Sequence, residues 1–243
     1  MQIGQKVLHL TSVDSTNNYA ANLLKRGELV NGTVILADDQ CAGRGQRNTK
    51  WQSNPSENLT ISFFLDDVNL SVDRQFVLTQ LVTLGLLHFF EKEDIEAVIK
   101  WPNDIYVGNR KISGVLIENQ LRGNQVQSAI VGIGINVNQK GFDGLTATSI
   151  FNETGAFSSI TEQMFSLIHS MNEVFARHKS DFTTLKKMYE THLYRKNVRA
   201  KFEDVHGKFT GVIQGTTDQG ELIVLRDNQQ EQTYSLKEIS FIF

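Results

Sequence analysis

The sequence predicts an α+β fold, in which a mixed sheet packs against helices and a small β-rich unit follows it. Two observations support this class. The apolar segments 99–107 and 111–121 flank the turn-rich tripeptide GNR, which is typical of an antiparallel hairpin, whereas other segments follow helical spacing. After about Leu193 the pattern changes to short strands separated by turns. We therefore predict two domains, 1–194 and 195–243.

Three helices and three further strands are expected in the first domain. Ser15 or Thr16 can cap a short helix that ends at Gly27. The nearly continuous apolar spacing of residues 73–91 predicts a well-buried helix. A capping box at residues 159–162 precedes a third helical segment. Three more segments have the apolar character of strands: 33–40, 58–67 and 126–138.

Charge and composition exclude several classes of protein. The 243 residues carry 24 Lys and Arg against 27 Asp and Glu, so a nucleic-acid partner is not expected. No apolar run approaches the roughly 20 residues that span a membrane. The single cysteine, Cys41, excludes an internal disulfide and a cysteine-based zinc site. The N-terminal segment lacks the features of a secretion signal, so we expect a cytoplasmic protein.

The polar segment 42–51, AGRGQRNTKW, alternates glycines with cations between two apolar strands. Gly43 and Gly45 lack the Cβ atoms that keep a backbone from approaching a ligand, and three cations accompany them: Arg44, Arg47 and Lys50. An anion site and a solvated basic loop are both compatible with this pattern. Neither a Walker motif nor a complete dinucleotide fingerprint occurs, since GIGIN at 132–136 lacks the third glycine.

Two further clusters hold candidate binding residues. In KWPND, 100–104, Pro102 within a strand-like run indicates a bulge or an edge. Lys111 follows the hairpin turn and precedes apolar residues, so its ammonium is placed either against a pocket or in solvent. Segment 12–20, SVDSTNNYA, gathers small hydroxyl and amide groups at a helix start, where capping explains part of the pattern. The histidines show no metal-ligand spacing.

Six segments, in order along the chain, make this sequence similar to the biotin protein ligases. They are DSTN (14–17), QCAGRGQRNTKW (40–51), NLTISF (58–63), KWPNDIY (100–106), RKISGVLIE (110–118) and GIGINVN (132–138). The similarity extends into GVIQGTTDQGELIV and therefore covers nearly the whole chain. It implies a class II synthetase-like catalytic domain followed by a small SH3-like β-barrel.

The resemblance implies that the protein activates biotin with ATP and Mg²⁺ to form biotinyl-5′-AMP, and then transfers the biotinyl group to a lysine of a biotin carboxyl carrier protein. Neither step needs an enzyme nucleophile, and the sequence has no recognised nucleophile–base motif. The first step joins a carboxylate to a phosphate, so cations must lie between two anions in a site without water. The oligomeric state stays open between monomer and homodimer.

The resemblance also implies roles for individual residues. Lys111 and Arg44 are the implied catalytic cations. Biotin binding is implied for Ser15, Thr16, Asn17, Gln40, Arg44, Gly45, Gln46 and Lys111. Binding of ATP and the adenylate is implied for Arg44, Gln46, Arg47, Lys111 and Asn136. Asp104 is implied either as a Mg²⁺ ligand or as a residue that orients Lys111.

We expect segment 43–50 to be mobile without ligand and to order over the adenylate, because an acyl-adenylate must be shielded from water. Two residues depart from the family pattern: Gln46 stands where many relatives have arginine, and Cys41 where threonine or glutamine is common. Loss of one charge-assisted contact, about 1.5 to 3 kcal/mol, would weaken retention of the intermediate, and Arg47 is the candidate to compensate.

About fourteen residues precede the DSTN segment, too few for a helix-turn-helix DNA reader, so we expect an enzyme without repressor activity. Two alternatives stay open. A lipoate or octanoyl protein ligase shares the fold, but the GRGQR and KWPND segments disfavour it. A non-catalytic biotin-binding regulatory module is disfavoured by the presence of Lys111 and Asn136.

Overall fold

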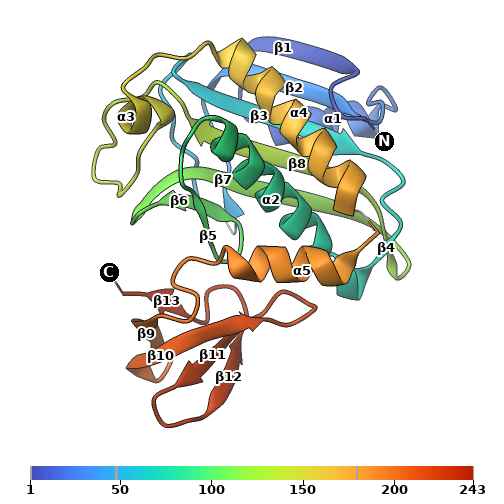
Figure 1. Ribbon diagram of the computed structural model, residues 1–243. Coiled ribbons are helices and arrows are strands. Elements are labelled where there is room, and N and C mark those ends of the chain that lie inside the picture. The colour runs from blue at the N-terminus through green and yellow to red at the C-terminus, as the bar shows by residue number, and fades with distance from the viewer. Residues whose placement is uncertain (1, 47–48, 179, 243) are drawn as a thin grey trace.

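The computed structural model describes residues 2–46, 49–178 and 180–242. Among these residues a mixed eight-stranded sheet forms the larger part of the molecule (Figure 1). Its strands are, in spatial order, β1 (Lys6–Val13), β2 (Thr33–Gln40), β3 (Asn58–Leu65), β8 (Gln125–Asn136), β7 (Arg110–Arg122), β6 (Asp104–Val107) and β5 (Val98–Lys100), with β4 (Leu70–Ser71) paired to β8. β1 and β2 are parallel, and the other neighbours are antiparallel. The predicted α+β class with a mixed sheet is confirmed.

Helices pack on this sheet (Figure 1). α1 (Thr16–Lys25) contacts β2, β3 and β8, whereas α2 (Phe76–Lys92) contacts β6 and β7 and packs against α4 (Ile160–His178). α3 (Ile150–Thr154) and the 3-10 turn η2 (Val72–Arg74) lie in connections, and α5 (Phe182–Thr191) packs against α2. α5 was not predicted from the sequence, because this helix buries only two residues, Leu185 and Tyr189. No helix in the described ranges is both long and apolar enough to cross a membrane.

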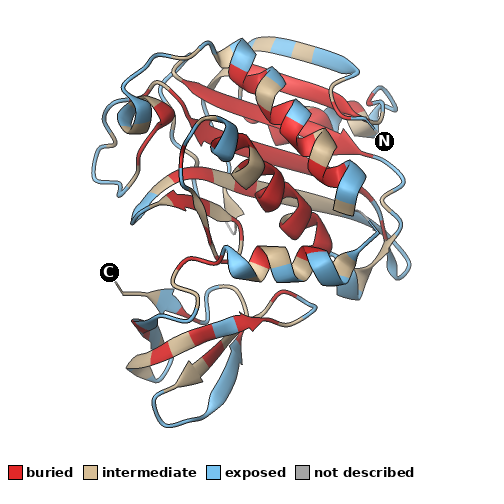
Figure 2. Cartoon of the chain, in the orientation of Figure 1, coloured by how far each residue is buried: buried red, intermediate tan, exposed pale blue. Residues whose placement is uncertain are grey.

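The two faces of the sheet differ because successive side chains of a strand point to opposite sides. In β3, Ile61 and Phe63 are each 1% exposed and join the main core with α2 and α4. Figure 2 shows this buried layer between the sheet and the helices in red. Each side chain of this kind contributes roughly 1.5 to 3 kcal/mol when fully buried. Ser62, between them, points to the opposite face, where it contacts α1.

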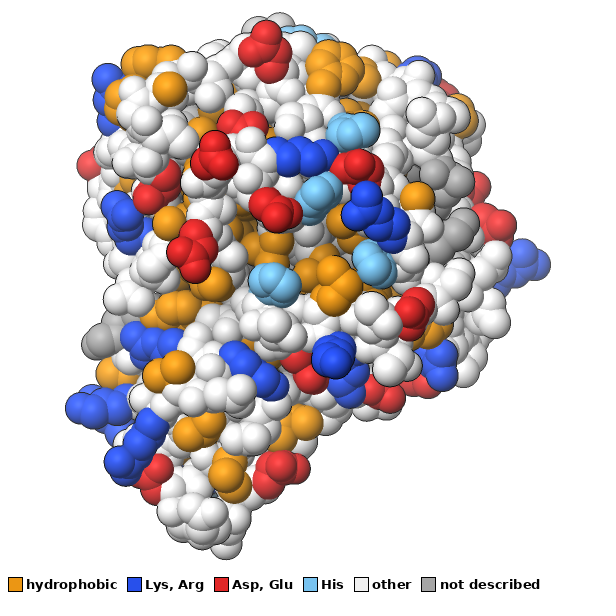
Figure 3. Space-filling view, in the orientation of Figure 1, with side chains coloured by type: hydrophobic (Ala, Val, Ile, Leu, Met, Phe, Trp, Pro, Cys, Tyr) orange, Lys and Arg blue, Asp and Glu red, His pale blue; other side chains and the backbone are white. Residues whose placement is uncertain are grey.

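A smaller core covers part of the α1 face. It consists of Ala20, Leu23, Leu29, Ile35, Phe64 and Ile130. Farther along β8 the same face carries Gly132 and Gly134, which have no side chains to cover the sheet. The glycines leave room above the strand, and the candidate site lies there. The outer side of the α2 and α4 layer is polar instead, with histidine and acidic side chains visible in Figure 3.

The C-terminal strands form a second, five-stranded antiparallel sheet. In spatial order it contains β12 (Glu231–Tyr234), β11 (Leu222–Arg226), β10 (Gly207–Thr216), β9 (Arg199–Asp204) and β13 (Ser240–Phe241). The sheet is open, since the described residues of its end strands, β12 and β13, do not pair with each other. Hydrogen bonds tie the C-terminal unit to the larger part: among them, Trp101 Nε1 donates to the Gly220 carbonyl at 2.8 Å, and the Thr216 amide donates to Glu190 Oε1 at 2.8 Å.

Candidate active site

A cavity of about 760 Å³ opens on the α1 face of the sheet. Side chains and backbone from both ends of the chain line it. The described lining residues are 15–17, Gln40, 44–46, 49–51, Ile61, 100–104, Lys111, 114–116, 132–134, Leu236, Lys237 and 239–241. A second cavity of similar volume lies beside it and shares the wall formed by Arg44 and Trp51. Candidate segments that lie far apart in the sequence therefore meet around one cavity.

The start of α1 supplies a buried polar cluster. Ser15, Thr16 and Asn17 are 2%, 3% and 2% exposed. Gln40 Oε1 accepts from the backbone amide of Thr16 at 2.7 Å and from its hydroxyl at 3.1 Å. Ser62 Oγ lies 2.6 Å from Thr16 Oγ1 and donates to Asn17 Oδ1 at 2.6 Å. The structure joins Thr16, Asn17 and Gln40 in one network with Ser62, a buried hydroxyl of β3 that was not predicted as a site residue, and Ser15 borders the same cavity.

Glycines form the floor of the cavity because neighbouring side chains occupy the space of their Cβ atoms. A Cβ on Gly132 would lie 2.3 Å from Asn17 Oδ1, and a Cβ on Gly134 would lie 2.4 Å from the indole ring of Trp51. The Trp51 ring thus packs on the strand at Gly134, with its indole N–H buried and without a hydrogen-bond partner among the described residues. The GIGIN motif therefore serves close packing of side chains on a strand, and no dinucleotide helix follows it.

Lys111 enters the cavity because β7 contains a bulge. Asp104 pairs with Gly114 and Tyr106 pairs with Lys111, so one extra residue, Ile112, lies between the two pairs. The bulge places Lys111 and Gly114 on the same face, although they are three positions apart in the sequence. Lys111 Nζ lies 2.6 Å from Asp104 Oδ1, and both side chains are about one-third exposed. Lys111 Nζ also lies 5.9 Å from the centre of the Trp51 ring.

Three hydrogen bonds hold the WPN loop that precedes Asp104. Trp101 donates to Gly220, the Tyr189 hydroxyl donates to the Pro102 carbonyl at 2.8 Å, and the Asn103 amide donates to the Val115 carbonyl. Burial raises the pKa of Tyr189 well above its usual value, so the phenol stays a donor. These bonds give the Asp104 carboxylate a fixed position beside Lys111.

Lys100 is a second cation in the cavity wall. It donates to the Tyr106 hydroxyl at 3.0 Å, and its ammonium lies 5.5 Å from the centre of the Phe241 ring. Burial lowers the pKa of Lys100, and Asp104 opposes this shift. Burial and the Asp104 charge raise the pKa of Tyr106 to about 12. The sequence showed Lys100 within KWPND, but it gave no signal for this partly desolvated position.

The described residues of segment 43–50 form a narrow hairpin. Gly45 N donates to the Thr49 carbonyl at 2.7 Å, and Thr49 N donates to the Gln46 carbonyl at 3.1 Å. Arg44 Nη2 lies 2.7 Å from Glu118 Oε1, and Arg44 Nη1 donates to Asn18 Oδ1 at 2.5 Å. The predicted residue Arg47 lies outside the described residues. Ligand-dependent ordering of the segment stays a prediction.

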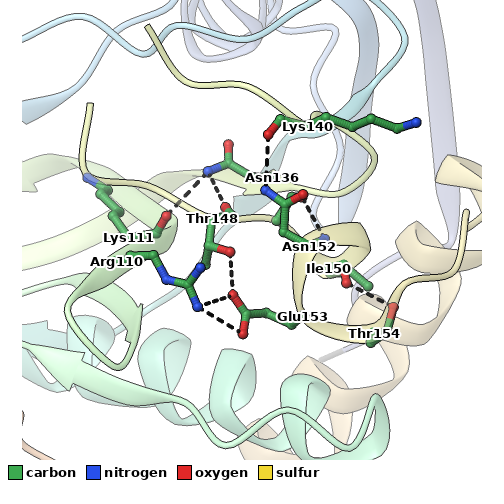
Figure 4. A network of polar contacts seen from close by, with 10 residues as sticks. Arg110, Lys111, Asn136, Lys140, Thr148, Ile150, Asn152, Glu153 and Thr154 are labelled. Carbon is green, nitrogen blue, oxygen red and sulfur yellow. Dashed lines mark hydrogen bonds and ion pairs between the residues drawn. The ribbon is translucent and has the colours of Figure 1, made fainter. Parts of the chain in front are cut away.

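Asn136 braces the backbone of Lys111, as Figure 4 shows. Its Nδ2 donates to the Thr148 carbonyl at 2.9 Å and to the Lys111 carbonyl at 3.4 Å. The Thr148 amide in turn donates to the Lys111 carbonyl at 2.9 Å, and Glu153 accepts from Arg110 and from the Thr148 hydroxyl. Asn136 is 3% exposed and is not among the described lining residues, so its implied contact with adenine stays a prediction.

Comparisons with known proteins agree with this geometry. The model of the biotin/lipoate A/B protein ligase family matches residues 10–136. The bifunctional ligase/repressor BirA of Bacillus spizizenii is 28% identical over 243 residues, which span 96% of this chain and 73% of that protein. The biotin–[acetyl-CoA-carboxylase] ligase of Paracoccus denitrificans is 32% identical over 131 residues, or 53% of each chain.

A solved structure matches almost the whole chain. The biotin protein ligase from Aquifex aeolicus in complex with biotin and ATP has a TM-score of 0.75 and 30% identity, covering 98% of this chain and 99% of that one. The matched family model spans the segment that contains α1, the glycine-rich hairpin, Lys111 and the glycine floor. The chain therefore belongs to the biotin/lipoate A/B protein ligase family.

Proposed function

We propose that this chain is an ATP-dependent biotin protein ligase. Biotin's carboxylate oxygen attacks the α-phosphorus of ATP, the bond to the β-phosphate oxygen breaks, and pyrophosphate leaves. The amine of a carrier lysine then attacks the acyl carbon of biotinyl-5′-AMP, the C–O bond breaks, and AMP leaves with loss of a proton from nitrogen. The main support is the position of the Lys111 ammonium, which faces a cavity of about 760 Å³. The chain belongs to a family in which a solved relative binds biotin and ATP.

The α1 end of the cavity supplies the biotin subsite. A ureido group needs both donors and acceptors, and the buried hydroxyl and amide groups of Ser15, Thr16, Asn17 and Gln40 provide them. Thr16, Asn17 and Gln40 are already held by one another or by Ser62, so these three side chains lose little freedom on binding. Gly45 and Gln46, in the hairpin that borders the same cavity, complete the subsite.

Lys111 and Arg44 neutralise the anions that the first step joins. Lys111 has a fixed backbone and a carboxylate partner, so its ammonium is preorganised toward the acyl phosphate. Arg44 and Gln46 border the same cavity, and the adenylate phosphate lies between these groups and Lys111. Asn136 is proposed to bind the edge of the adenine ring. Its hydrogen bond to the Thr148 carbonyl would hold its side chain in place.

Mg²⁺ is proposed as an ATP-bound ion. The described residues contain no group of three or more His, Cys, Asp and Glu that could hold a metal by themselves. Asp104 is the single carboxylate in the described cavity wall, which fits a cation whose other ligands are phosphates and water. Mg²⁺ would supply charge neutralisation at the phosphates, and Asp104 would hold it or orient Lys111.

The two-domain division is likewise proposed, with residues 1–194 catalytic and 195–243 forming an SH3-like unit. The separate five-stranded antiparallel sheet supports this division. Leu236, Lys237 and 239–241, from the end of the C-terminal unit, border the cavity, which suits a role in engaging ATP. We propose a biotin carboxyl carrier protein of acetyl-CoA carboxylase, or of a related biotin enzyme, as the acceptor.

Incubation with biotin, MgATP and a purified carrier domain tests the function. Mass spectrometry should show one biotinyl addition on the carrier, and labelled pyrophosphate should exchange into ATP only when biotin is present. Addition of lipoate or octanoate in place of biotin would identify the alternative ligase. Biotin binding without exchange would identify a non-catalytic binding module.

A further inference from the structure

The carboxylate of Glu118 joins two residues of the candidate site. Its Oε1 accepts from Arg44 Nη2 at 2.7 Å, and its Oε2 accepts from Asn17 Nδ2 at 2.7 Å. The other terminal nitrogen of Arg44 donates to Asn18 Oδ1 at 2.5 Å. Both ends of the Arg44 guanidinium are therefore engaged by this protein's own side chains.

The partners of the guanidinium do not line the first cavity. Arg44 borders both cavities, whereas Glu118 borders only the second and Asn18 borders neither. Lys111 belongs to the first cavity. The positive charge that the proposed reaction needs beside a phosphate is thus neutralised by a protein carboxylate outside the cavity where the phosphate would lie.

We propose that Glu118 is a positioning residue for Arg44, which holds the guanidinium as its counterion in the ligand-free protein and yields it to the carboxylate or phosphate of the ligand. This inference rests on the proposed function. The paired side chains are 43% and 34% exposed, so the pair is weak and an anion in a less hydrated cavity can displace it.

Asn17 connects this exchange to occupancy of the first cavity. Its side chain borders that cavity and donates to the second oxygen of Glu118. A ligand that takes the Asn17 amide removes one of the bonds that fix the carboxylate. Binding at the α1 end therefore loosens Glu118 and favours the transfer of Arg44 to the anion.

The ligand-free protein tests the pairing directly. Phenylglyoxal modifies accessible guanidinium groups, and peptide mass spectrometry gives the rate at Arg44. Glu118→Gln keeps an acceptor for Asn17 but removes the charge, so Arg44 should react roughly two- to fivefold faster, as expected for loss of an exposed ion pair. Glu118→Asp retains the charge and should stay closer to the wild-type rate than Glu118→Gln.

Glu28→Gln is the matched control. Glu28 pairs with Arg26 at 3.1 Å just beyond the C-terminal end of α1, and both side chains are more than half exposed. In this variant Arg26 should react faster, while Arg44 keeps the wild-type rate and turnover is unchanged. An Arg44 rate in Glu118→Gln equal to that of the wild type overturns the proposal.

Turnover provides the second measurement. If Glu118 competes with the ligand for Arg44, Glu118→Gln should lower the KM for ATP roughly two- to fivefold at saturating biotin, with kcat within about twofold. A raised KM would mean that Glu118 holds Arg44 in the ligand-bound state, which also overturns the proposal. Absence of biotin-dependent turnover in the wild type would reject the proposed function, while the phenylglyoxal rates would still decide the pairing.

Discussion

Lys111 Nζ lies 2.6 Å from Asp104 Oδ1, across two neighbouring strands whose register is shifted by one residue. In a regular strand, Lys111 and Gly114 are three positions apart and would point to opposite sides of the sheet. The bulge thus places the ammonium above a glycine that leaves space for it: a Cβ on Gly114 would lie 3.0 Å from Lys111 Nζ. The position of the cation depends on backbone register as well as on residue type.

Replacement of Lys111 should abolish most of the activity. A preorganised donor contributes about 3 to 4 kcal/mol at a transition state, so Lys111→Ala should slow biotin-dependent pyrophosphate exchange roughly a hundredfold or more. Lys111→Arg should fail as well, since a planar fork does not replace a compact ammonium. Lys208→Ala, at an exposed position of β10, is the control and should exchange at the wild-type rate. Full exchange by Lys111→Ala would contradict the assigned role.

A methyl group on the cavity floor should reduce ligand binding. In Gly132→Ala the new Cβ would overlap Asn17 Oδ1, and in Gly134→Ala it would overlap the Trp51 ring. Each change should weaken binding of biotin or ATP roughly tenfold, about 1.4 kcal/mol, as measured by isothermal titration calorimetry. Gly141→Ala is the matched control, because nothing lies within 4 Å of its Cβ position. Wild-type affinities in both floor variants would show that Asn17 and Trp51 can shift without consequence.

A cation restored at position 46 should retain the adenylate longer. Gln46 borders the first cavity, so an arginine there can add one charge-assisted contact to the phosphate, worth about 1.5 to 3 kcal/mol. Gln46→Arg should therefore release labelled biotinyl-5′-AMP at least about tenfold more slowly. Rapid gel filtration of the enzyme–adenylate complex gives the release rate. An unchanged release rate would show that glutamine at position 46 does not weaken retention of the adenylate.

Glu173 should titrate far below an ordinary carboxyl group. Lys92 donates to it at 2.7 Å and His88 Nε2 lies 2.9 Å away, and these bonds lower the pKa of Glu173 to about 2. Because the folded-state pKa lies below the unfolded value of 4.5, this group stabilises the fold above pH 4.5 and loses that contribution as the pH falls toward 2. Carboxyl ¹³C NMR should show a midpoint near 2, whereas a midpoint near 4.5 would contradict the network.

Much of the fold follows from apolar spacing. The strands around β3 and β8 and the helices α1, α2 and α4 appear at the predicted positions, because each buries a periodic apolar set. α2 begins at Phe76, three residues later than predicted, since η2 takes up the preceding turn. Closure of the C-terminal sheet could not be predicted from strand spacing, because it depends on pairing between its end strands.

The sequence predicted residues that meet in the candidate site, but not the contacts between them. Residues at the start of α1, Gln40 and Lys111 meet around one cavity, as the ordered motifs implied. Local sequence does not reveal contacts between residues that are distant along the chain. The ion pair of Arg44 with Glu118 and the hydrogen bond from Ser62 to Asn17 could therefore not be predicted. Asn136 shows the same limit, since its amide turns toward the backbone of Thr148 and Lys111.

The strict alternation along β3 and β8 separates two kinds of mutation by the parity of the residue number. From 59 to 65 and from 129 to 135, odd positions belong to the hydrocarbon core, whereas the even positions between them face α1 and the cavity. Substitutions at the odd positions therefore act on the main core, whereas substitutions at the even positions act on the packing of α1 or on the cavity floor. In the neighbouring strand β7, the bulge at Ile112 reverses this relation between residue number and face. Lys111 therefore faces the cavity although its number is odd.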